Sequence, residues 1–170
     1  ERYRDWRVEL MPLTKDKYFE LIDSNSDYPH FRCALGAYIP GSLYKYFSIP
    51  DDSDEARKRF EQLKSGEIWF SKRSGLNDPF EFEHIALKGA QNDARQYYLN
   101  KQQELEVCCF SALLYNKLMW SHYAAGYKGY CVEFRVESPE RFYPVIYENE
   151  VPDLSQEYQR FYDMRNEMCA

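Results

Sequence analysis

The chain has 170 residues, 44% of them hydrophobic and 29% charged, which excludes a disordered chain and predicts a single globular domain over residues 1–170. Its net charge of −6 and its pI of about 5.2 argue against a general nucleic-acid-binding surface, because phosphate groups are bound by a basic footprint. No apolar run is long enough to cross a bilayer, so we expect no membrane-spanning segment.

The cysteines and histidines argue against two further classes of site. The five cysteines are odd in number and form no CxxC pair, so we expect reduced thiols in a cytoplasmic protein. No signal-peptide pattern follows Glu1, which favours the same location. His30, His84 and His122 show no zinc-ligand spacing, so no metal site is predicted. The sequence also lacks the glycine-rich phosphate loops and the GxSxG element of hydrolases.

Apolar residues at helical spacing predict helices in five stretches of the chain. These stretches are residues 15–23, 52–65, 89–104, 116–125 and 154–168. Thr14 and Asp52 are expected to cap the first two, and Gly66 is expected to end the second. Residues 24–29 are rich in Ser, Asn, Asp and Pro, so we expect a loop there.

Alternating or continuous apolar runs predict about five strands. These runs are residues 43–47, 67–71, 105–111, 130–137 and 143–147. Residues 107–110 are apolar throughout, which predicts burial on both faces. Residues 130–137 alternate strictly, which predicts one packed face and one face toward water or a site. We therefore expect an α+β fold with a mixed, largely antiparallel sheet of about five strands and inserted helices.

The first candidate for ligand contact is Tyr44-Lys45-Tyr46 on the strand predicted over residues 43–47. A lysine between two aromatic rings can face a ligand phosphate. It can equally lay its stem along the sheet and reach solvent. We expect Tyr44, Lys45 and Tyr46 to bind a cofactor, with a structural lysine as the open alternative.

The second candidate is formed by Ser71, Asn77 and Asp78, which follow a predicted strand. Polar groups on loops after strands are frequent ligand contacts, so we expect these three to bind a cofactor. A structural alternative stays open, because Asp78 with Glu81 three residues later is also a well-formed helix start.

The third candidate combines residues of the 116–125 helix with the strand at 130–137. Trp120 and Tyr123 are expected to contact the cofactor, and His122 to act in catalysis, although a lone histidine is also a common hydrogen-bonded core residue. Glu133 is the expected catalytic carboxylate. Alternatively, it forms an ion pair with the nearby Arg135 that contributes little stability.

Several segments occur in an order that resembles a known bacterial family. LYKYF is followed by a helix, a glycine, IWFSKRSGLNDPFE, CCFS, LMWSHYAAGYKGYCVEF and FYPVIY. In this order they resemble domain-of-unknown-function family 2971 over residues 43–154, with NDPFE and MWSHYA…KGYCVEF as the hallmarks. The resemblance implies a bacterial or phage-associated protein and no particular activity.

The first few of these segments, from LYKYF through the helix and glycine to the strand that ends in Ser71, also resemble the start of ADP-ribosyltransferase-like domains. In those domains a strand with an aromatic residue and a strand ending in serine flank a nicotinamide pocket. This resemblance implies that Tyr44 or Tyr46 and Ser71 line the pocket and that NAD is the cofactor. Family members continue with a W-x-x-E-x-E-x-R segment, the natural source of the glutamate that orients the ribose. Without that segment, the sequence is expected to be a fragment truncated at its C-terminus, or this form of catalysis is absent.

Two functions follow as expectations. The first is a nucleotide- or NAD-binding, ADP-ribosyltransferase-like effector in phage defence or toxicity, with Glu133 and His122 as its catalytic groups. The second is a non-enzymatic module that binds a protein partner or a small ligand through an aromatic face. The acidic charge and the missing terminal glutamate favour the second, and whether the protein is an enzyme stays open.

Overall fold

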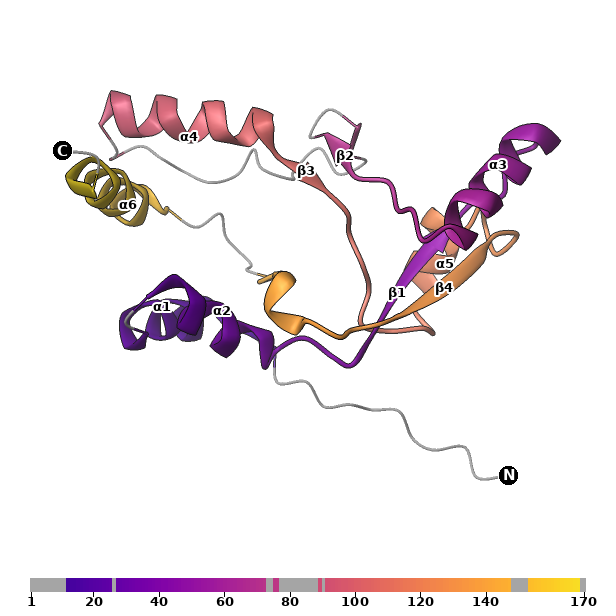
Figure 1. Ribbon diagram of the computed structural model, residues 1–170, viewed down its shortest axis with the longest axis horizontal. Coiled ribbons are helices and arrows are strands. Elements are labelled where there is room, and N and C mark those ends of the chain that lie inside the picture. Colours follow the sequence, from indigo (N-terminus) through magenta and orange to yellow (C-terminus); the bar gives the residue numbers. More distant parts are fainter. Residues whose placement is uncertain are drawn as a thin grey trace, which may run out of the picture. The chain divides into compact units, whose positions relative to one another are not determined.

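The computed structural model of this chain describes residues 12–25, 27–72, 75–76, 89, 91–147 and 153–168 (Figure 1). The chain forms two compact units. The first comprises Glu1–Gly66 and Cys109–Tyr147, and the second comprises Glu67–Cys108 and Glu148–Ala170. The expectation of a single domain stays a prediction.

Helices and strands alternate irregularly along the chain, which confirms a mixed α and β structure. The first unit holds α1 (Lys15–Ser24), α2 (Tyr28–Gly36), β1 (Ser42–Phe47), α3 (Ser53–Lys64), α5 (Lys117–Tyr123), β4 (Tyr130–Arg135) and the 3-10 helix η2 (Pro139–Arg141). The second unit holds β2 (Ser71–Lys72), α4 (Asn92–Glu104), β3 (Glu106–Val107) and α6 (Ser155–Met168). No helix in the part of the chain that the structure describes is both long and apolar enough to cross a membrane.

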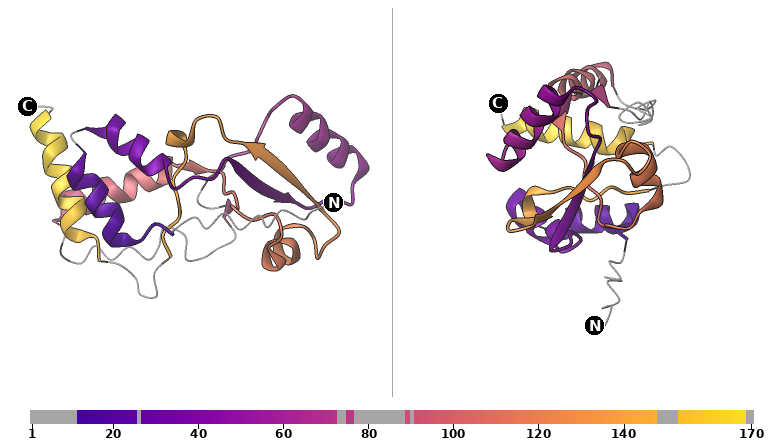
Figure 2. Two further views of the ribbon diagram at one scale, coloured as in Figure 1. Left: turned by 90° about the horizontal axis from the view of Figure 1, so that it is seen from below. Right: turned by 90° about the vertical axis from the view of Figure 1, so that its right-hand side faces the viewer.

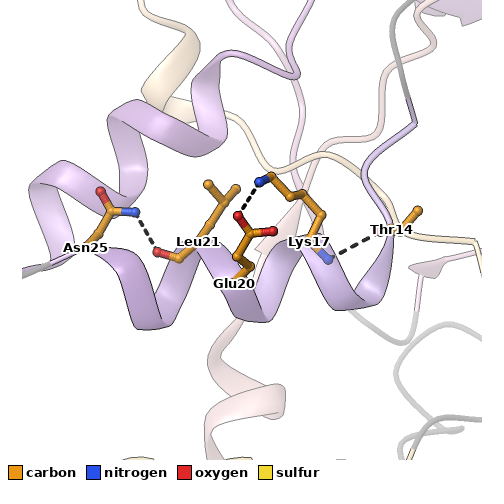
Figure 3. A network of polar contacts seen from close by, with 5 residues as sticks. All are labelled: Thr14, Lys17, Glu20, Leu21 and Asn25. Carbon is orange, nitrogen blue, oxygen red and sulfur yellow. Dashed lines mark hydrogen bonds and ion pairs between the residues drawn. The ribbon is translucent and has the colours of Figure 1, made fainter.

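The predicted helix caps at Thr14 and Asp52 are confirmed. The Thr14 hydroxyl accepts a hydrogen bond from the backbone N–H of Lys17 at 3.2 Å, as Figure 3 shows. The Asp52 carboxylate accepts two from the first turn of α3, at 2.8 and 2.9 Å. Gly66 follows α3 with φ +78°, the left-handed conformation that ends a helix.

Both ends of α1 are therefore held by side chains. Figure 3 shows the Asn25 side-chain amide donating to the Leu21 carbonyl oxygen at 2.5 Å, and the Lys17 ammonium paired with Glu20 at 2.5 Å. The Lys17–Glu20 pair is exposed, so it contributes little to stability.

The predicted loop over residues 24–29 is wrong, because α2 begins within it. Asp27 caps this helix by accepting a hydrogen bond from the His30 N–H at 2.9 Å, and the same carboxylate contacts the His30 ring. These hydrogen bonds hold the pKa of Asp27 below its usual value. Pro29 is tolerated because it lies in the first turn, where its missing N–H costs no helical hydrogen bond.

Packing of α1 against α2 builds the hydrophobic core of the first unit. Its buried residues are Leu13, Phe31 and Leu35, and the partly buried residues around them are Tyr18, Leu21, Ile22, Tyr38 and Ile146. Phe31 meets the Tyr18 ring edge-on, with 5.6 Å between centroids. Tyr18, Leu21 and Ile22 therefore form the inner face of α1.

The sheet of the first unit consists of β1 and β4, which run antiparallel side by side (Figures 1 and 2). The ladder places Tyr44 opposite Glu133 and Tyr46 opposite Cys131. Ser111 adds a single bridge on the other edge of β1, where it exchanges two backbone hydrogen bonds of 2.8 Å with Tyr44.

The predicted sheet of about five strands is not found among the described residues, which form two sheets of two strands each. In the second unit β2 and β3 pair over two residues each. The predicted burial of residues 107–110 on both faces is wrong, since Cys109 is exposed and the other three are only partly buried.

Residues 143–147 form no strand, and Arg32 of α2 supplies the physical reason. The buried Arg32 guanidinium donates to the carbonyl oxygen of Phe142 at 2.9 Å and to that of Glu140. It also lies 3.6 Å from the centroid of the Tyr143 ring. These contacts tie the start of the segment to a helix, so that it does not join a sheet edge.

In the second unit α4 packs against α6 through tyrosine rings. Tyr98 and Tyr158 lie 4.2 Å apart between centroids, and Tyr97 and Tyr162 lie 5.8 Å apart. The Ser155 hydroxyl at the start of α6 accepts a hydrogen bond from the Gly89 N–H at 2.9 Å. The predictions of helices over residues 89–104 and 154–168 are thereby confirmed, with slightly shorter bounds.

Candidate functional site

Tyr44, Lys45 and Tyr46 were expected to form one binding group, but successive side chains of β1 project to opposite faces of the sheet. Tyr44 and Tyr46 lie on the same face as Glu133 and Cys131, their partners on β4. We call these four residues the tyrosine face. Lys45 points to the opposite side of the sheet, so a site that uses Tyr44, Lys45 and Tyr46 together on one face is not formed.

Tyr44 and Glu133 form the polar part of the tyrosine face. The Tyr44 hydroxyl donates to Glu133 Oε1 at 3.2 Å, and Glu133 is exposed while Tyr44 is half-buried. Burial raises the pKa of the Tyr44 hydroxyl, and the nearby Glu133 carboxylate raises it further. Tyr44 therefore stays protonated at neutral pH and remains a hydrogen-bond donor.

Tyr46 and Trp120 make structural contacts, and the ligand contact expected of them stays a prediction. The buried Tyr46 hydroxyl donates to the carbonyl oxygens of Leu113 and Leu114, at 2.5 and 2.8 Å. The Trp120 indole N–H donates to the same Leu114 carbonyl at 2.9 Å, and its ring meets Tyr46 edge-on at 5.3 Å. Together they attach the segment before α5 to β1.

Lys45 is held on the other side of the sheet. Its Nζ donates to the Cys109 carbonyl oxygen at 3.1 Å and lies 5.9 Å from the Phe47 ring centroid and 5.7 Å from that of Phe110. Lys45 is half-buried and its ammonium group bonds a backbone carbonyl, which agrees with the structural alternative for this lysine.

His122 and Tyr123 lie on α5, and both side chains are exposed. Asn116 caps this helix by accepting from the N–H groups of Leu118 and Met119 at 3.0 and 3.3 Å. Because the His122 ring faces solvent, it does not fit the alternative of a hydrogen-bonded core histidine. The joint catalytic role expected of His122 and Glu133 stays a prediction.

The expected cofactor site of Ser71, Asn77 and Asp78 lies only partly within the described residues. Ser71 lies on β2 of the second unit, half-buried and opposite Val107 of β3. Asn77 and Asp78 lie outside the described residues. Their roles in cofactor binding stay predictions.

Five exposed apolar residues lie on or near α5 in the chain, and the sequence had indicated only Tyr123 among them as a candidate. We call them the α5 surface: Leu113, Tyr115, Leu118, Tyr123 and Tyr127, which are 57%, 83%, 69%, 42% and 59% exposed. Tyr127 has φ +70°, a strained conformation for a tyrosine, and its hydroxyl donates to the Lys117 carbonyl oxygen at 3.1 Å. The helical position of Leu118, opposite the packed Trp120, is a signal that could have identified it.

Arg135 extends the tyrosine face. It lies two residues beyond Glu133 on β4, so both side chains project to the same side, roughly 7 Å apart along the strand. Both are exposed. The face thus offers an aromatic ring, a hydroxyl paired with a carboxylate, and a guanidinium group.

These groups can stack on a flat ring, accept hydrogen bonds from hydroxyls and bind an anion. No group of three or more His, Cys, Asp or Glu residues in the described ranges is placed to hold a metal ion. In comparisons with known proteins, no family model, no curated protein and no solved structure matches this chain.

Proposed function

We propose that the tyrosine face, together with Arg135, binds a nucleotide, and that NAD is its natural ligand. The hydrogen bond between Tyr44 and Glu133, on an exposed face beside Arg135, is the observation that carries this proposal. It agrees with the bacterial ADP-ribosyltransferase-like effector, in phage defence or toxicity, that the sequence resembles. The same proposal includes membership of domain-of-unknown-function family 2971. It also includes an ADP-ribosyltransferase-like fold with a sheet of about five strands.

Each group on this face has a counterpart in a nucleotide. The Tyr44 ring can stack on a base, and the Glu133 carboxylate can accept hydrogen bonds from ribose hydroxyls. Arg135 can bind phosphate oxygens with two parallel N–H donors. In ADP-ribosyl transfer the bond between ribose and nicotinamide breaks and positive charge develops on the ribose, which a carboxylate such as that of Glu133 stabilises.

A thermal-shift series with NAD, ADP-ribose, AMP and nicotinamide tests the proposal. A nucleotide present at 100 times its dissociation constant stabilises the folded state by about 2.7 kcal/mol, which appears as a clear rise in Tm. We expect Tyr44→Ala to abolish the rise because the stacking ring is lost. Glu133→Gln is expected to weaken binding about tenfold because the charged acceptor is replaced.

Lys45→Met is the matched control for this series. It removes a charge from the neighbouring residue of β1 but keeps the packed stem, and the ammonium group lies on the opposite face. We expect it to leave nucleotide binding unchanged. If none of the four compounds raises the Tm of the unsubstituted protein, nucleotide binding by this face is wrong.

A second candidate function is a non-enzymatic interaction module, and the α5 surface favours it. Five large exposed apolar side chains lie within residues 113–127, and aromatic residues of this kind dominate the energy of protein interfaces. The partner that fits this surface is a protein with an apolar patch of its own.

Substitutions on the α5 surface test this second function. We expect Leu118→Asp to weaken a captured partner's binding at least about tenfold, because a carboxylate replaces a central apolar contact. Leu105→Asp is the control, since Leu105 is an exposed leucine of the second unit, away from α5 in the chain. A partner measured by calorimetry that binds both variants equally well does not use the α5 surface.

A further inference from the structure

The outer edge of β4 has backbone groups without a partner among the described residues, where β4 pairs with β1 alone. Tyr44 uses its N–H and C=O to bond Ser111, so both groups point away from β4. Glu133 lies opposite Tyr44 in the antiparallel ladder, so this is a non-hydrogen-bonded pair and the N–H and C=O of Glu133 point away from β1. The residues that offer outward groups are Cys131, Glu133 and Arg135.

An open edge of this kind accepts another strand through main-chain hydrogen bonds. The side chains on β4 indicate which strand fits. Glu133 and Arg135 carry opposite charges, both are exposed, and both lie on the tyrosine face. A strand with the reversed order of charges is complementary to this edge, and β4 of a second copy in antiparallel orientation is such a strand.

The possible registers of this pairing can be compared. In the new ladder, a residue whose backbone N–H and C=O point outward must lie opposite a residue of the partner with the same orientation. The possible registers therefore differ from one another by two residues. One register places Glu133 opposite the partner's Arg135 and, by two-fold symmetry, Arg135 opposite the partner's Glu133. The adjacent registers place Glu133 opposite the partner's Glu133, or Arg135 opposite the partner's Arg135, and like charges in these positions are destabilising.

The same register also suits the other side of the strand. Phe134 then lies beside the partner's Phe134 at the two-fold axis, and Val132 lies beside the partner's Val136. These are apolar pairs in the narrow, non-hydrogen-bonded positions of the new ladder, where side chains are closest. Both faces of β4 are thus self-complementary in a single register.

We propose that two copies of this chain form a dimer by antiparallel pairing of their β4 edges, with reciprocal contacts between Glu133 and the partner's Arg135. The sheet then continues from β1 through β4 into the partner's β4 and β1. The proposed dimer does not require a nucleotide, although it uses the same Glu133 and Arg135 side chains, and its test uses the protein without ligand.

Sedimentation velocity of the full chain at micromolar concentrations measures the dimer. We expect Glu133→Arg to weaken dimerisation at least about tenfold, because both charge pairs become Arg–Arg pairs. Arg135→Glu is expected to have a similar effect through two Glu–Glu pairs. Lys58→Glu reverses an exposed charge on α3 and is expected to leave the dimer intact.

Experiments that restore opposite charges across the interface test whether the substitutions act through this contact or by disturbing the protein in general. An equimolar mixture of the Glu133→Arg and Arg135→Glu variants is expected to form a heterodimer, because both pairs become attractive again. The double variant E133R/R135E is expected to form a homodimer as tight as the unsubstituted protein. Far-ultraviolet circular dichroism checks that each variant is folded.

Three results would overturn the proposal: a monomeric unsubstituted chain, a dimer that both single variants retain, or single variants that neither the mixture nor the double variant restores. The second would place the contact on another surface. The third would show that the charges act within one copy of the chain.

Discussion

Gly129→Ala is expected to destabilise this protein by more than about 3 kcal/mol, beyond the usual cost of an overpacked site. A Cβ atom at this position would lie 2.0 Å from the carbonyl oxygen of Phe47 and 2.9 Å from the Cα of Ala124. Both are backbone atoms, one at the end of β1 and the other just after α5. Neither can move without displacing its element, so even the smallest side chain does not fit.

Gly41→Ala is the control for this prediction, because a Cβ atom there would have no heavy atom within 4 Å and the residue does not have a positive φ. We expect its effect on the free energy of unfolding, measured with urea, to stay within about 0.5 kcal/mol. Equal midpoints for the two variants would show that β1 and the end of α5 are not in close contact. Close packing alone therefore explains why a glycine stands at position 129 in the KGYCVEF segment, without any role in ligand binding.

Leu35→Ala is expected to cost about 2–5 kcal/mol, the range for a buried leucine whose cavity cannot collapse. Leu35 is fully buried between α1 and α2 and belongs to the core with Leu13 and Phe31. Its removal leaves the Arg32 contacts in place, so we expect a lower urea midpoint together with an unchanged far-ultraviolet circular dichroism spectrum at low urea.

Leu118→Ala is the matched control, because it makes the same chemical change at a leucine that is 69% exposed. Its effect on stability is expected to lie within about 0.5 kcal/mol. If Leu35→Ala costs no more than Leu118→Ala, the helices α1 and α2 do not form the core of this protein. The comparison therefore tests the packing of the first unit directly.

The helices were largely predictable from the sequence because their determinants are local. Thr14 and Asp52 cap helices through N–H groups two or three residues away, and Gly66 ends α3 through its own backbone conformation. The helix α2 was missed because its cap at Asp27 lies in a stretch whose composition is typical of loops. The Asp-x-Pro order was the local signal that could have revealed it.

The candidate site was predictable only as a set of residues. Strand periodicity correctly separated Glu133 from Phe134, but the sequence offered no register for β1 against β4. That register brings the Tyr44 hydroxyl to 3.2 Å from Glu133. Tyr46 and Trp120 were expected to contact a ligand, and a sequence does not show which of its aromatic residues are buried. Their hydrogen bonds to the Leu114 carbonyl show the structural role.

By itself the sequence determined the helix boundaries near good caps, the alternation of β4 and the net charge of −6, since each depends on neighbouring residues or on composition alone. Only the tertiary structure decided that β1 pairs with β4 and in which register, and that Arg32 holds residues 140–142. Those features depend on contacts between residues about 90 to 110 positions apart, such as Tyr44 with Glu133 and Arg32 with Phe142. The free energy of such contacts comes from burial and pairing in the folded state, and no local pattern encodes it.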